Sequence, residues 1–238
     1  MKLLRTRPAS RQTHWRGVFG QVCNRLVTAY GRPTLGNYRD PVREILYIVL
    51  SAKTTERLYQ RAYRGLKRRY KTLPQLADAD IAGIEDCIRG AGLAKKRAPQ
   101  IQKLAQKLIA DLGPNPSRKL RKLEPETAFR YLVGLPGVGP KSALCVMTMS
   151  LDADVFAVDA NVQRVAGRLG ALPDNLKHYE AQKRLPSLVP IGRSRDLHVG
   201  LVIHGRRICL PRAPRCDGCV LLDLCKFGKT RMRDQIGS

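Results

Sequence analysis

The stretch 135–143, which reads LPGVGPKSA, constrains the fold of this chain more than any other segment. Gly137 and Gly139 give the backbone freedom there and leave no side chain in the way of a close-approaching ligand. Pro140 suits the first turn of a following helix. The stretch therefore predicts a hairpin between two helices. Free N–H groups at a helix start favour an anion, so Gly137, Val138 and Gly139 are expected to bind a nucleic-acid backbone. A plain corner between two helices is the alternative interpretation.

The charge of the chain points in the same direction. Its 238 residues include 44 Lys and Arg against 19 Asp and Glu, a net charge of +25. Such a field suits a polyanion, either nucleic acid or an anionic membrane surface. No apolar run reaches the ~18 residues that span a bilayer, and no signal-peptide pattern opens the chain. We therefore expect a monomeric, nucleoid-associated protein of the cytoplasm that binds nucleic acid and no membrane.

Hydrophobic periodicity predicts an all-α protein, because alternating strand patterns are absent. A basic arm at residues 1–17 precedes the first helix, and Asp40 with Pro41 marks the start of a buried central helix. The expected helices cover residues 18–30, 42–52, 55–70, 78–89, 96–112, 125–133, 140–149, 160–169, 178–188 and 195–208.

The seven cysteines fall into two groups. Three are isolated in apolar helical patterns, where we expect them to pack in the core: Cys23, Cys87 and Cys145. The other four have the spacing C-x6-C-x2-C-x5-C: Cys209, Cys216, Cys219 and Cys225. Four thiolates in one short loop can bind a tetrahedral metal ion or an iron–sulfur cluster. The spacing alone does not choose between them, and four unliganded thiols are a third interpretation.

These motifs together resemble the endonuclease III family, the helix–hairpin–helix DNA glycosylases of base-excision repair. The resemblance extends from about Asp40 to Cys225, which is most of the chain. It rests on the hairpin 135–143, Val158-Asp159 with Asp159 eighteen residues after Lys141, the four spaced cysteines, His204-Gly205-Arg206 before Cys209, and Leu50-Ser51-Ala52.

The resemblance implies a two-lobed all-α fold with a C-terminal iron–sulfur cluster loop. One lobe would be residues 36–152, ending in the helix–hairpin–helix. The other would join residues 1–35 to 153–238 and carry the cluster loop 209–225. The family resemblance also implies a 4Fe–4S cofactor on the four spaced cysteines. Double-stranded DNA with a damaged base or an abasic site would bind between the lobes, with the flipped base in a pocket.

Lys141 and Asp159 match the catalytic residues of the family. The Lys141 amine would attack the sugar, expel the base and form a Schiff base that permits strand cleavage by β-elimination. The Asp159 carboxylate would stabilise the positive charge that develops on the sugar. For Lys141 the alternative is a phosphate-binding lysine. Asp159 is also expected to cap the helix 160–169, and both roles can hold together.

Four further residues are expected to contact DNA. Leu93 matches the residue that enters the base stack, although it could instead be a core leucine at a helix end. Lys53 stands where the family has a glutamine that fills the space of the flipped base; a lysine there would reach a phosphate or a base edge. Arg212 and Arg215 lie in the proline-rich loop 210–215 and are expected to face phosphates.

The sequence therefore indicates a DNA glycosylase with abasic-site lyase activity, for which the family resemblance implies an oxidised pyrimidine as substrate. Three departures from the family pattern bear on that preference: Lys53, Asn161 in place of a histidine, and Pro140 in place of a basic residue. Two alternatives stay open. One is a monofunctional glycosylase for another lesion or mismatch that uses water activated by Asp159, and the other is a non-catalytic DNA-binding protein.

Overall fold

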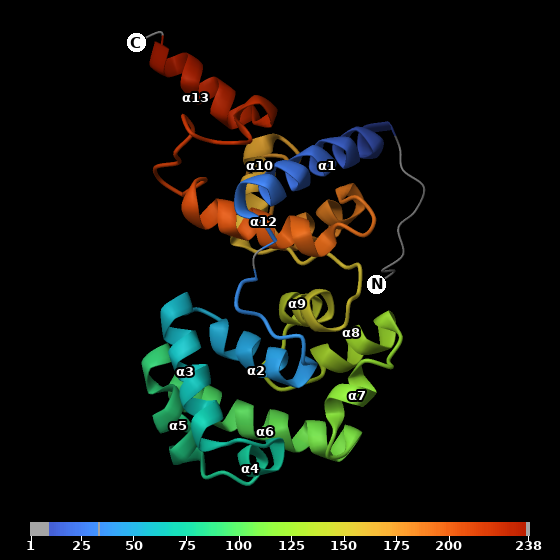
Figure 1. Cartoon of the computed structure of the whole chain (residues 1–238), viewed down its shortest axis with the longest axis vertical. Helices are drawn as coiled ribbons and strands as arrows, with labels where there is room; N and C mark the ends of the chain where they lie inside the picture. The colour runs from blue at the N-terminus through green and yellow to red at the C-terminus, as the bar shows by residue number, and fades with distance from the viewer. Residues whose placement is uncertain (1–9, 33, 237–238) are drawn as a thin grey trace. The chain divides into compact units, whose positions relative to one another are not determined.

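The computed structural model describes residues 10–32 and 34–236, and these residues form helices and loops without a strand (Figure 1). The all-α prediction is confirmed. The first nine residues of the expected basic arm lie outside the described residues. The prediction is wrong for the rest of the arm, residues 10–17, because Ser10–Tyr30 forms one helix. In the part of the chain that the structure describes, no helix has the length and apolar content needed to cross a membrane.

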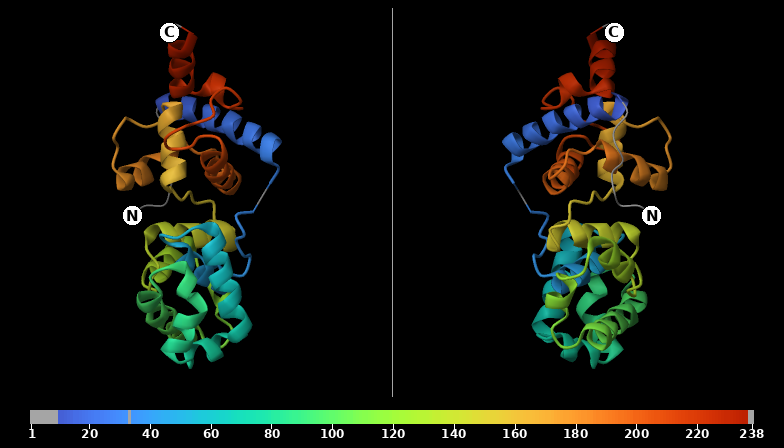
Figure 2. Two further views of the ribbon diagram at one scale, coloured as in Figure 1. Left: turned by 90° about the vertical axis from the view of Figure 1, so that its left-hand side faces the viewer. Right: turned by 90° about the vertical axis from the view of Figure 1, so that its right-hand side faces the viewer.

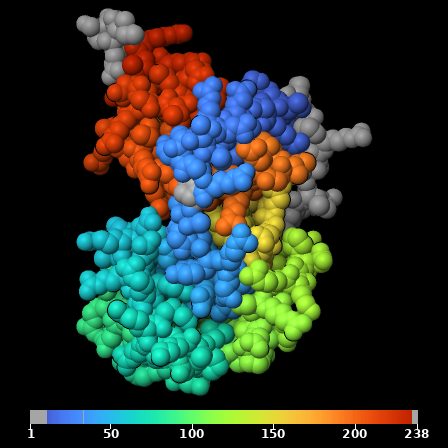
Figure 3. Space-filling view, viewed as in Figure 1, coloured from blue at the N-terminus to red at the C-terminus, as the bar shows by residue number. Residues whose placement is uncertain are grey.

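Contacts within the chain divide it into two compact units. We call Asn37–Ala153 the hairpin unit, and Met1–Gly36 with Asp154–Ser238 the cysteine-loop unit. The helices of the hairpin unit are α2 (Pro41–Ser51), α3 (Glu56–Arg69), α4 (Leu73–Ala77), α5 (Ile81–Ile88), the 3-10 turn η1 (Arg89–Ala91), α6 (Ala94–Leu112), α7 (Pro116–Leu120), α8 (Pro125–Val133) and α9 (Pro140–Ser150). In the space-filling view, atoms of α3 lie on one side of α2 and atoms of α7 and α8 on the other (Figure 3).

Helix α2 is the centre of the hairpin unit, as its apolar sequence predicted. It packs against α3 and α9, and most of its residues are buried. Asp40 caps its first turn by accepting a hydrogen bond from the Arg43 amide at 2.9 Å, and Pro41 is its first residue. Glu44 is fully buried, and its carboxylate accepts hydrogen bonds from the Asn37 amide group and from the Tyr38 N–H, the latter at 2.7 Å.

The cysteine-loop unit joins segments from both ends of the chain. Its helices are α1 (Ser10–Tyr30), α10 (Ala160–Leu169), α11 (His178–Arg184), the 3-10 turns η2 (Leu185–Leu188) and η3 (Leu222–Leu224), α12 (Ser194–Arg207) and α13 (Lys226–Ile236). Helix α12 packs against α1 and α10, and the three lie side by side in Figure 2. Their shared core includes Phe19, Leu26, Val162 and Leu201, none of which is more than 1% exposed.

Several predicted helix limits differ from the structure for local reasons. Helix α5 begins at Ile81 rather than 78, because Asp80 caps it by accepting from the Gly83 N–H. The segment expected as one helix at 178–188 is divided, since the backbone tightens into η2 around Pro186. Helices α4, α7 and α13 were not expected. Cys23 and Cys145 are buried as predicted, whereas Cys87 is half-buried.

Glu44 gives a direct test of how the start of the hairpin unit is held to α2. Glu44→Met keeps the side-chain length but leaves the Asn37 and Tyr38 donors without this acceptor. We expect the free energy of unfolding to fall by about 1–3 kcal/mol in urea titrations. Glu126→Met, at an exposed position on α8, is the matched control and should change stability by less than about 0.5 kcal/mol. Equal effects of the two substitutions would contradict this role of Glu44.

Candidate DNA-binding and catalytic site

The turn between α8 and α9 has the conformation that the hairpin sequence predicted. Gly137 lies at φ +79°, in the left-handed region that favours glycine, and the Val138 N–H donates to the Leu135 carbonyl at 3.1 Å. A Cβ at Gly137 would lie 3.4 Å from Val49 Cγ1 of α2, so the turn is packed closely on the central helix. The Val138 side chain is buried, so only its backbone can face a ligand.

Helix α9 presents unbonded backbone donors at its start. Gly139 supplies no side-chain cap, and Pro140 has no N–H. The first bond within the helix runs from the Ala143 N–H to the Gly139 carbonyl at 2.9 Å, so the N–H groups of Lys141 and Ser142 precede it. Such amides, together with the positive end of the helix dipole, form a site suited to a phosphate.

Lys141 is the second residue of α9 and its side chain is exposed. Among the described residues it takes part in no ion pair. Its amine is therefore exposed to solvent beside the hairpin turn, where a substrate can reach it.

Asp159 follows the buried residues Phe156–Val158 and caps α10, as predicted. One of its carboxylate oxygens accepts from the Val162 N–H at 2.8 Å, and the other accepts from the Asn161 side-chain amide at 3.2 Å. Asn161, which departs from the family pattern, thus supplies a donor to the carboxylate. Asp159 is half-buried, and it belongs to the cysteine-loop unit whereas Lys141 belongs to the hairpin unit.

Lys53 and Leu93 occupy similar backbone positions in the hairpin unit. Lys53 follows the last turn of α2 at φ +51°, and Leu93 precedes α6 at φ +55°. Both side chains are exposed, Leu93 by 53% of its surface. The alternative interpretation of Leu93 as a core leucine is therefore wrong. An exposed leucine on a strained turn is available to contact a ligand.

The structure brings the four spaced cysteines together around one pocket. This pocket is partly open to solvent and is also lined by apolar side chains such as Leu169 and Leu221. Within the described part of the chain, no three Cys, His, Asp or Glu side chains are close enough to hold a single metal ion. All four sulfur-bearing residues line the same pocket.

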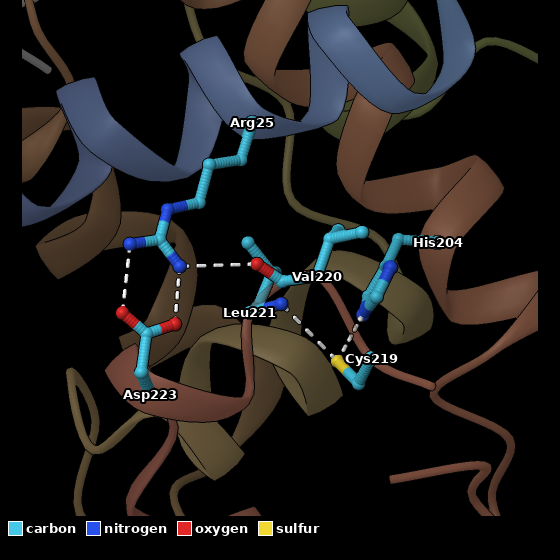
Figure 4. Close-up of polar contacts among 6 residues, drawn as sticks. All are labelled: Arg25, His204, Cys219, Val220, Leu221 and Asp223. Atoms are coloured by element: carbon cyan, nitrogen blue, oxygen red, sulfur yellow. Dashed lines mark hydrogen bonds and ion pairs between the residues drawn. The ribbon is translucent and has the colours of Figure 1, made fainter. Parts of the chain in front are cut away.

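Hydrogen-bond donors face three of the four sulfurs. Cys219 Sγ accepts from the Leu221 N–H at 3.4 Å and lies 3.5 Å from His204 Nε2 (Figure 4). Cys225 Sγ accepts from the Gly228 N–H at 3.3 Å. Arg168 Nη1 lies 3.2 Å from Cys209 Sγ. Donors of this kind stabilise thiolates, the form in which cysteine binds metals.

Burial sets the protonation of this pocket when no metal is bound. It raises the pKa of the Cys219 thiol to about 11, since the apolar surroundings disfavour the thiolate. It also lowers the pKa of His204 to about 4, so that imidazole is neutral, and its Nδ1 lies 2.9 Å from the Tyr30 hydroxyl. A cationic group in the pocket would favour the thiolates again. The four thiols and the donors that face three of their sulfurs therefore fit a metal cluster as its ligand set.

Arginines that sequence reasoning did not single out hold the cysteine loop. From α10, Arg164 donates to the carbonyls of Cys209 and Gly205, and Arg168 donates to those of Leu210 and Pro211. From α1, Arg25 binds the Asp223 carboxylate and the Val220 carbonyl (Figure 4). In a chain with 44 basic residues, no sequence signal separates these arginines from surface ones.

Arg212 and Arg215 are exposed in the loop after Cys209. The Arg215 N–H donates to the Ile208 carbonyl at 3.0 Å, which closes the loop at its base. The guanidinium groups of both residues are thus presented to solvent by a loop whose two ends are fixed.

Comparisons with known proteins agree with this arrangement. Residues 46–190 match the family described as "HhH-GPD superfamily base excision DNA repair protein". The endonuclease III of Bacillus subtilis is 31% identical over 194 residues, covering 82% of this chain and 84% of that protein. A thymine/uracil-DNA glycosylase of Methanothermobacter thermautotrophicus is 30% identical, over 79% of this chain and 83% of that protein. A solved endonuclease III–DNA complex superposes with a TM-score of 0.78 at 28% identity, covering 95% of this chain and all of that one. The chain therefore belongs to the HhH-GPD superfamily of base excision DNA repair proteins.

Proposed function

We propose that this protein is a DNA glycosylase that removes a damaged base and then cleaves the abasic site through a lysine Schiff base. The observation that carries the proposal is the placement of Lys141, exposed on the first turn of the helix that follows the phosphate-binding hairpin. A lysine that only bound phosphate could occupy many positions in a chain of charge +25. Lys141 lies beside the hairpin that would hold the DNA backbone.

The Lys141 amine is the nucleophile in this mechanism. Its nitrogen attacks C1′ of the sugar, and the base leaves with the electron pair of the glycosidic bond and takes up a proton. Loss of the amine proton and ring opening give the Schiff base. Removal of a C2′ proton then expels the 3′ phosphate by β-elimination.

The Asp159 carboxylate stabilises the sugar as positive charge develops on it. Its two oxygens are held by the Val162 N–H and the Asn161 amide, so the side chain is fixed before substrate arrives. A carboxylate that is already oriented needs little reorganisation during the reaction. Cap and catalyst are thus compatible roles for one residue.

The DNA contacts follow from the exposed groups of both units. The N–H groups of Gly137, Gly139, Lys141 and Ser142 bind phosphate, since the Val138 N–H is already bonded to the Leu135 carbonyl. Leu93 reaches into the base stack, and Lys53 reaches a base edge beside it. Arg212 and Arg215 add phosphate contacts from the cysteine loop. These assignments are supported by the exposure of the four side chains and by the donors at the start of α9.

The pocket of the four cysteines would hold a 4Fe–4S cluster. Cys209, Cys216, Cys219 and Cys225 would bind it, and the N–H donors and arginines around them would set its surroundings. A bound cluster would join Cys209, which follows the end of α12, to Cys216, Cys219 and Cys225 and so hold the cysteine loop together. The sequence contains no flavin or nicotinamide motif that would exchange electrons with the cluster. We therefore assign the cluster a structural role.

The substrate is proposed to be a modified pyrimidine, with an oxidised pyrimidine first. Endonuclease III proteins and a thymine/uracil-DNA glycosylase are similar to this chain to nearly the same degree. A panel of duplexes that each carry one oxidised pyrimidine, a mismatched thymine or uracil, or an alkylated purine tests this choice. Release of an alkylated purine alone would overturn the pyrimidine assignment.

Lys141 is tested by trapping its Schiff base. Borohydride should join wild-type protein covalently to a duplex with a cognate lesion or an abasic site. Lys141→Gln should abolish this adduct and strand cleavage while binding DNA, because the hairpin amides remain. Lys103→Gln, at an exposed position on α6, removes the same charge and should behave as wild type. Base release at a normal rate by Lys141→Gln would show that water is the nucleophile. A wild type without adduct or base release would favour a non-catalytic protein.

Asp159 is tested by a substitution that keeps the helix cap. Asp159→Asn retains an oxygen that accepts from the Val162 N–H, so the melting temperature should change little. Single-turnover base excision should fall by roughly 10²–10³, because the charge on the sugar loses its partner. Asp80→Asn makes the same change at the cap of α5 and is the control. An excision rate within a factor of two of wild type would leave Asp159 with the cap role alone.

The cluster is tested by metal analysis of the purified protein. We expect about four irons per chain with broad visible absorption. Cys216→Ser should lose the iron and make the cysteine loop more sensitive to protease. Cys87→Ser, which changes a half-buried cysteine outside the pocket, should keep both the iron and the protease resistance. Stoichiometric zinc in a colourless protein would contradict the assignment.

A further inference from the structure

Arg97 is a buried arginine that the mechanism above does not use. It lies in the first turns of α6 and is 4% exposed. Its guanidinium donates to three main-chain carbonyls: those of Leu50 and Ala91, each at 3.1 Å, and that of Ala52. In the part of the chain that the structure describes, no carboxylate is seen against this guanidinium. Burial of a charge without an acidic partner costs free energy, because the charge loses its hydration. The three hydrogen bonds to carbonyls compensate for part of that loss.

The three carbonyls belong to two separate turns. Leu50 and Ala52 are at the C-terminal end of α2, where helix carbonyls lack partners within the helix. Ala91 ends η1. The guanidinium therefore ties the end of α2 to the end of η1, which are about 40 residues apart in the sequence.

Each of these turns leads directly into a left-handed residue. The Ala52 carbonyl is part of the peptide group that precedes Lys53, at φ +51°. The Ala91 carbonyl precedes Gly92 and Leu93, at φ +73° and +55°. The Leu93 carbonyl in turn accepts from the Arg97 N–H at 2.9 Å. Only four non-glycine residues among those described have positive φ. The Arg97 guanidinium binds the peptide group next to one of them, Lys53, and the carbonyl two residues before another, Leu93.

We propose that Arg97 is a positioning residue that fixes the Lys53 and Leu93 turns to each other, so that Leu93 enters the DNA base stack and Lys53 reaches the base edge beside it as one rigid unit. The inference rests on the proposed function, since it takes Lys53 and Leu93 as DNA-contacting groups. Two turns that moved independently would have to be ordered separately when the base is extruded. The buried guanidinium of Arg97, with its several donors, orders both turns before DNA binds, so their ordering costs no further conformational entropy during base extrusion.

Lysine cannot replace Arg97 in this role. Arg97→Lys keeps the positive charge, but its compact ammonium group cannot reach carbonyls on both turns as the planar fork does. Non-specific DNA binding should therefore be unchanged. Base extrusion should suffer, whereas reaction at an abasic site should not, because no base has to leave the stack there.

The experiment compares wild type and Arg97→Lys on two duplexes. One has an oxidised pyrimidine next to 2-aminopurine, whose fluorescence rises when it unstacks, and the other has an abasic site. We expect Arg97→Lys to excise the lesion about 10- to 100-fold more slowly, with a reduced fluorescence rise. Its rate of borohydride-trapped adduct formation at the abasic site should stay within about twofold of wild type. Arg121→Lys is the matched control, because Arg121 also donates to two carbonyls, of Ser150 and Arg39, away from these turns.

Three results would overturn the inference: a normal fluorescence rise with Arg97→Lys, an equal loss at the abasic site, or an equal effect of Arg121→Lys. The fluorescence step needs no chemistry, so it tests Arg97 even if wild type removes no base, which would count against the proposed function alone. If Arg97→Lys does not fold, Lys53→Ala and Leu93→Ala give the same test. Coupled turns predict that their effects on unstacking are less than additive, and strict additivity would contradict the coupling.

Discussion

Arginine side chains that donate to main-chain carbonyls hold the loops on which the candidate site depends. Arg97 does so at the turns before Lys53 and Leu93, and Arg164 and Arg168 do so along the cysteine loop. Loop carbonyls have no partner from regular secondary structure, and a guanidinium offers five donors in one plane. A single side chain can therefore fix two or three peptide groups at once. Without these bonds the exposed groups of the site would rest on unsupported loops.

The composition explains why carbonyls and not carboxylates are the partners. With 44 basic and 19 acidic residues, most basic side chains cannot each have an acidic partner of their own. Several of the acids are engaged at helix starts, where Asp40, Asp80 and Asp159 accept from backbone N–H groups. A carbonyl satisfies the donors of an arginine but leaves its charge in place. The same bonds that order the loops thus preserve the positive field that attracts DNA.

The sequence was most informative where a feature needs a particular residue. The hairpin requires glycine at φ +79°, and the caps of α2 and α10 require a short side chain that accepts hydrogen bonds, so Gly137, Asp40 and Asp159 could all be recognised. The start of α1 was missed because the apolar periodicity that indicated this helix begins only at Val18. Helices α4 and α7 escaped notice because five residues are too short for a periodic pattern.

The partners of the basic residues could not be predicted at all. Arg97 lies in the sequence Lys95-Lys96-Arg97, where its neighbours are exposed and it is buried. Only the path of the chain decides which of the three points inward. The same limit applied to Leu93, whose sequence fitted both a core leucine and an exposed one. The structure resolves these cases because burial depends on packing partners that are distant in sequence.

Asn161 shows how a departure from the family pattern can be absorbed by its surroundings. Its amide has two sides: the nitrogen donates to Asp159, and the oxygen accepts from Arg164 Nη2 at 2.9 Å. Arg164 in turn binds the Cys209 carbonyl through Nε at 2.9 Å. Two side chains thus connect the candidate catalytic carboxylate to the first cysteine of the loop. If the cysteine loop became disordered, Arg164 would lose its bond to the Cys209 carbonyl. Asn161 and the Asp159 carboxylate would then be held less firmly, because each of these side chains is hydrogen-bonded to the next. The pocket of the four cysteines and the candidate catalytic carboxylate are therefore linked parts of the same unit.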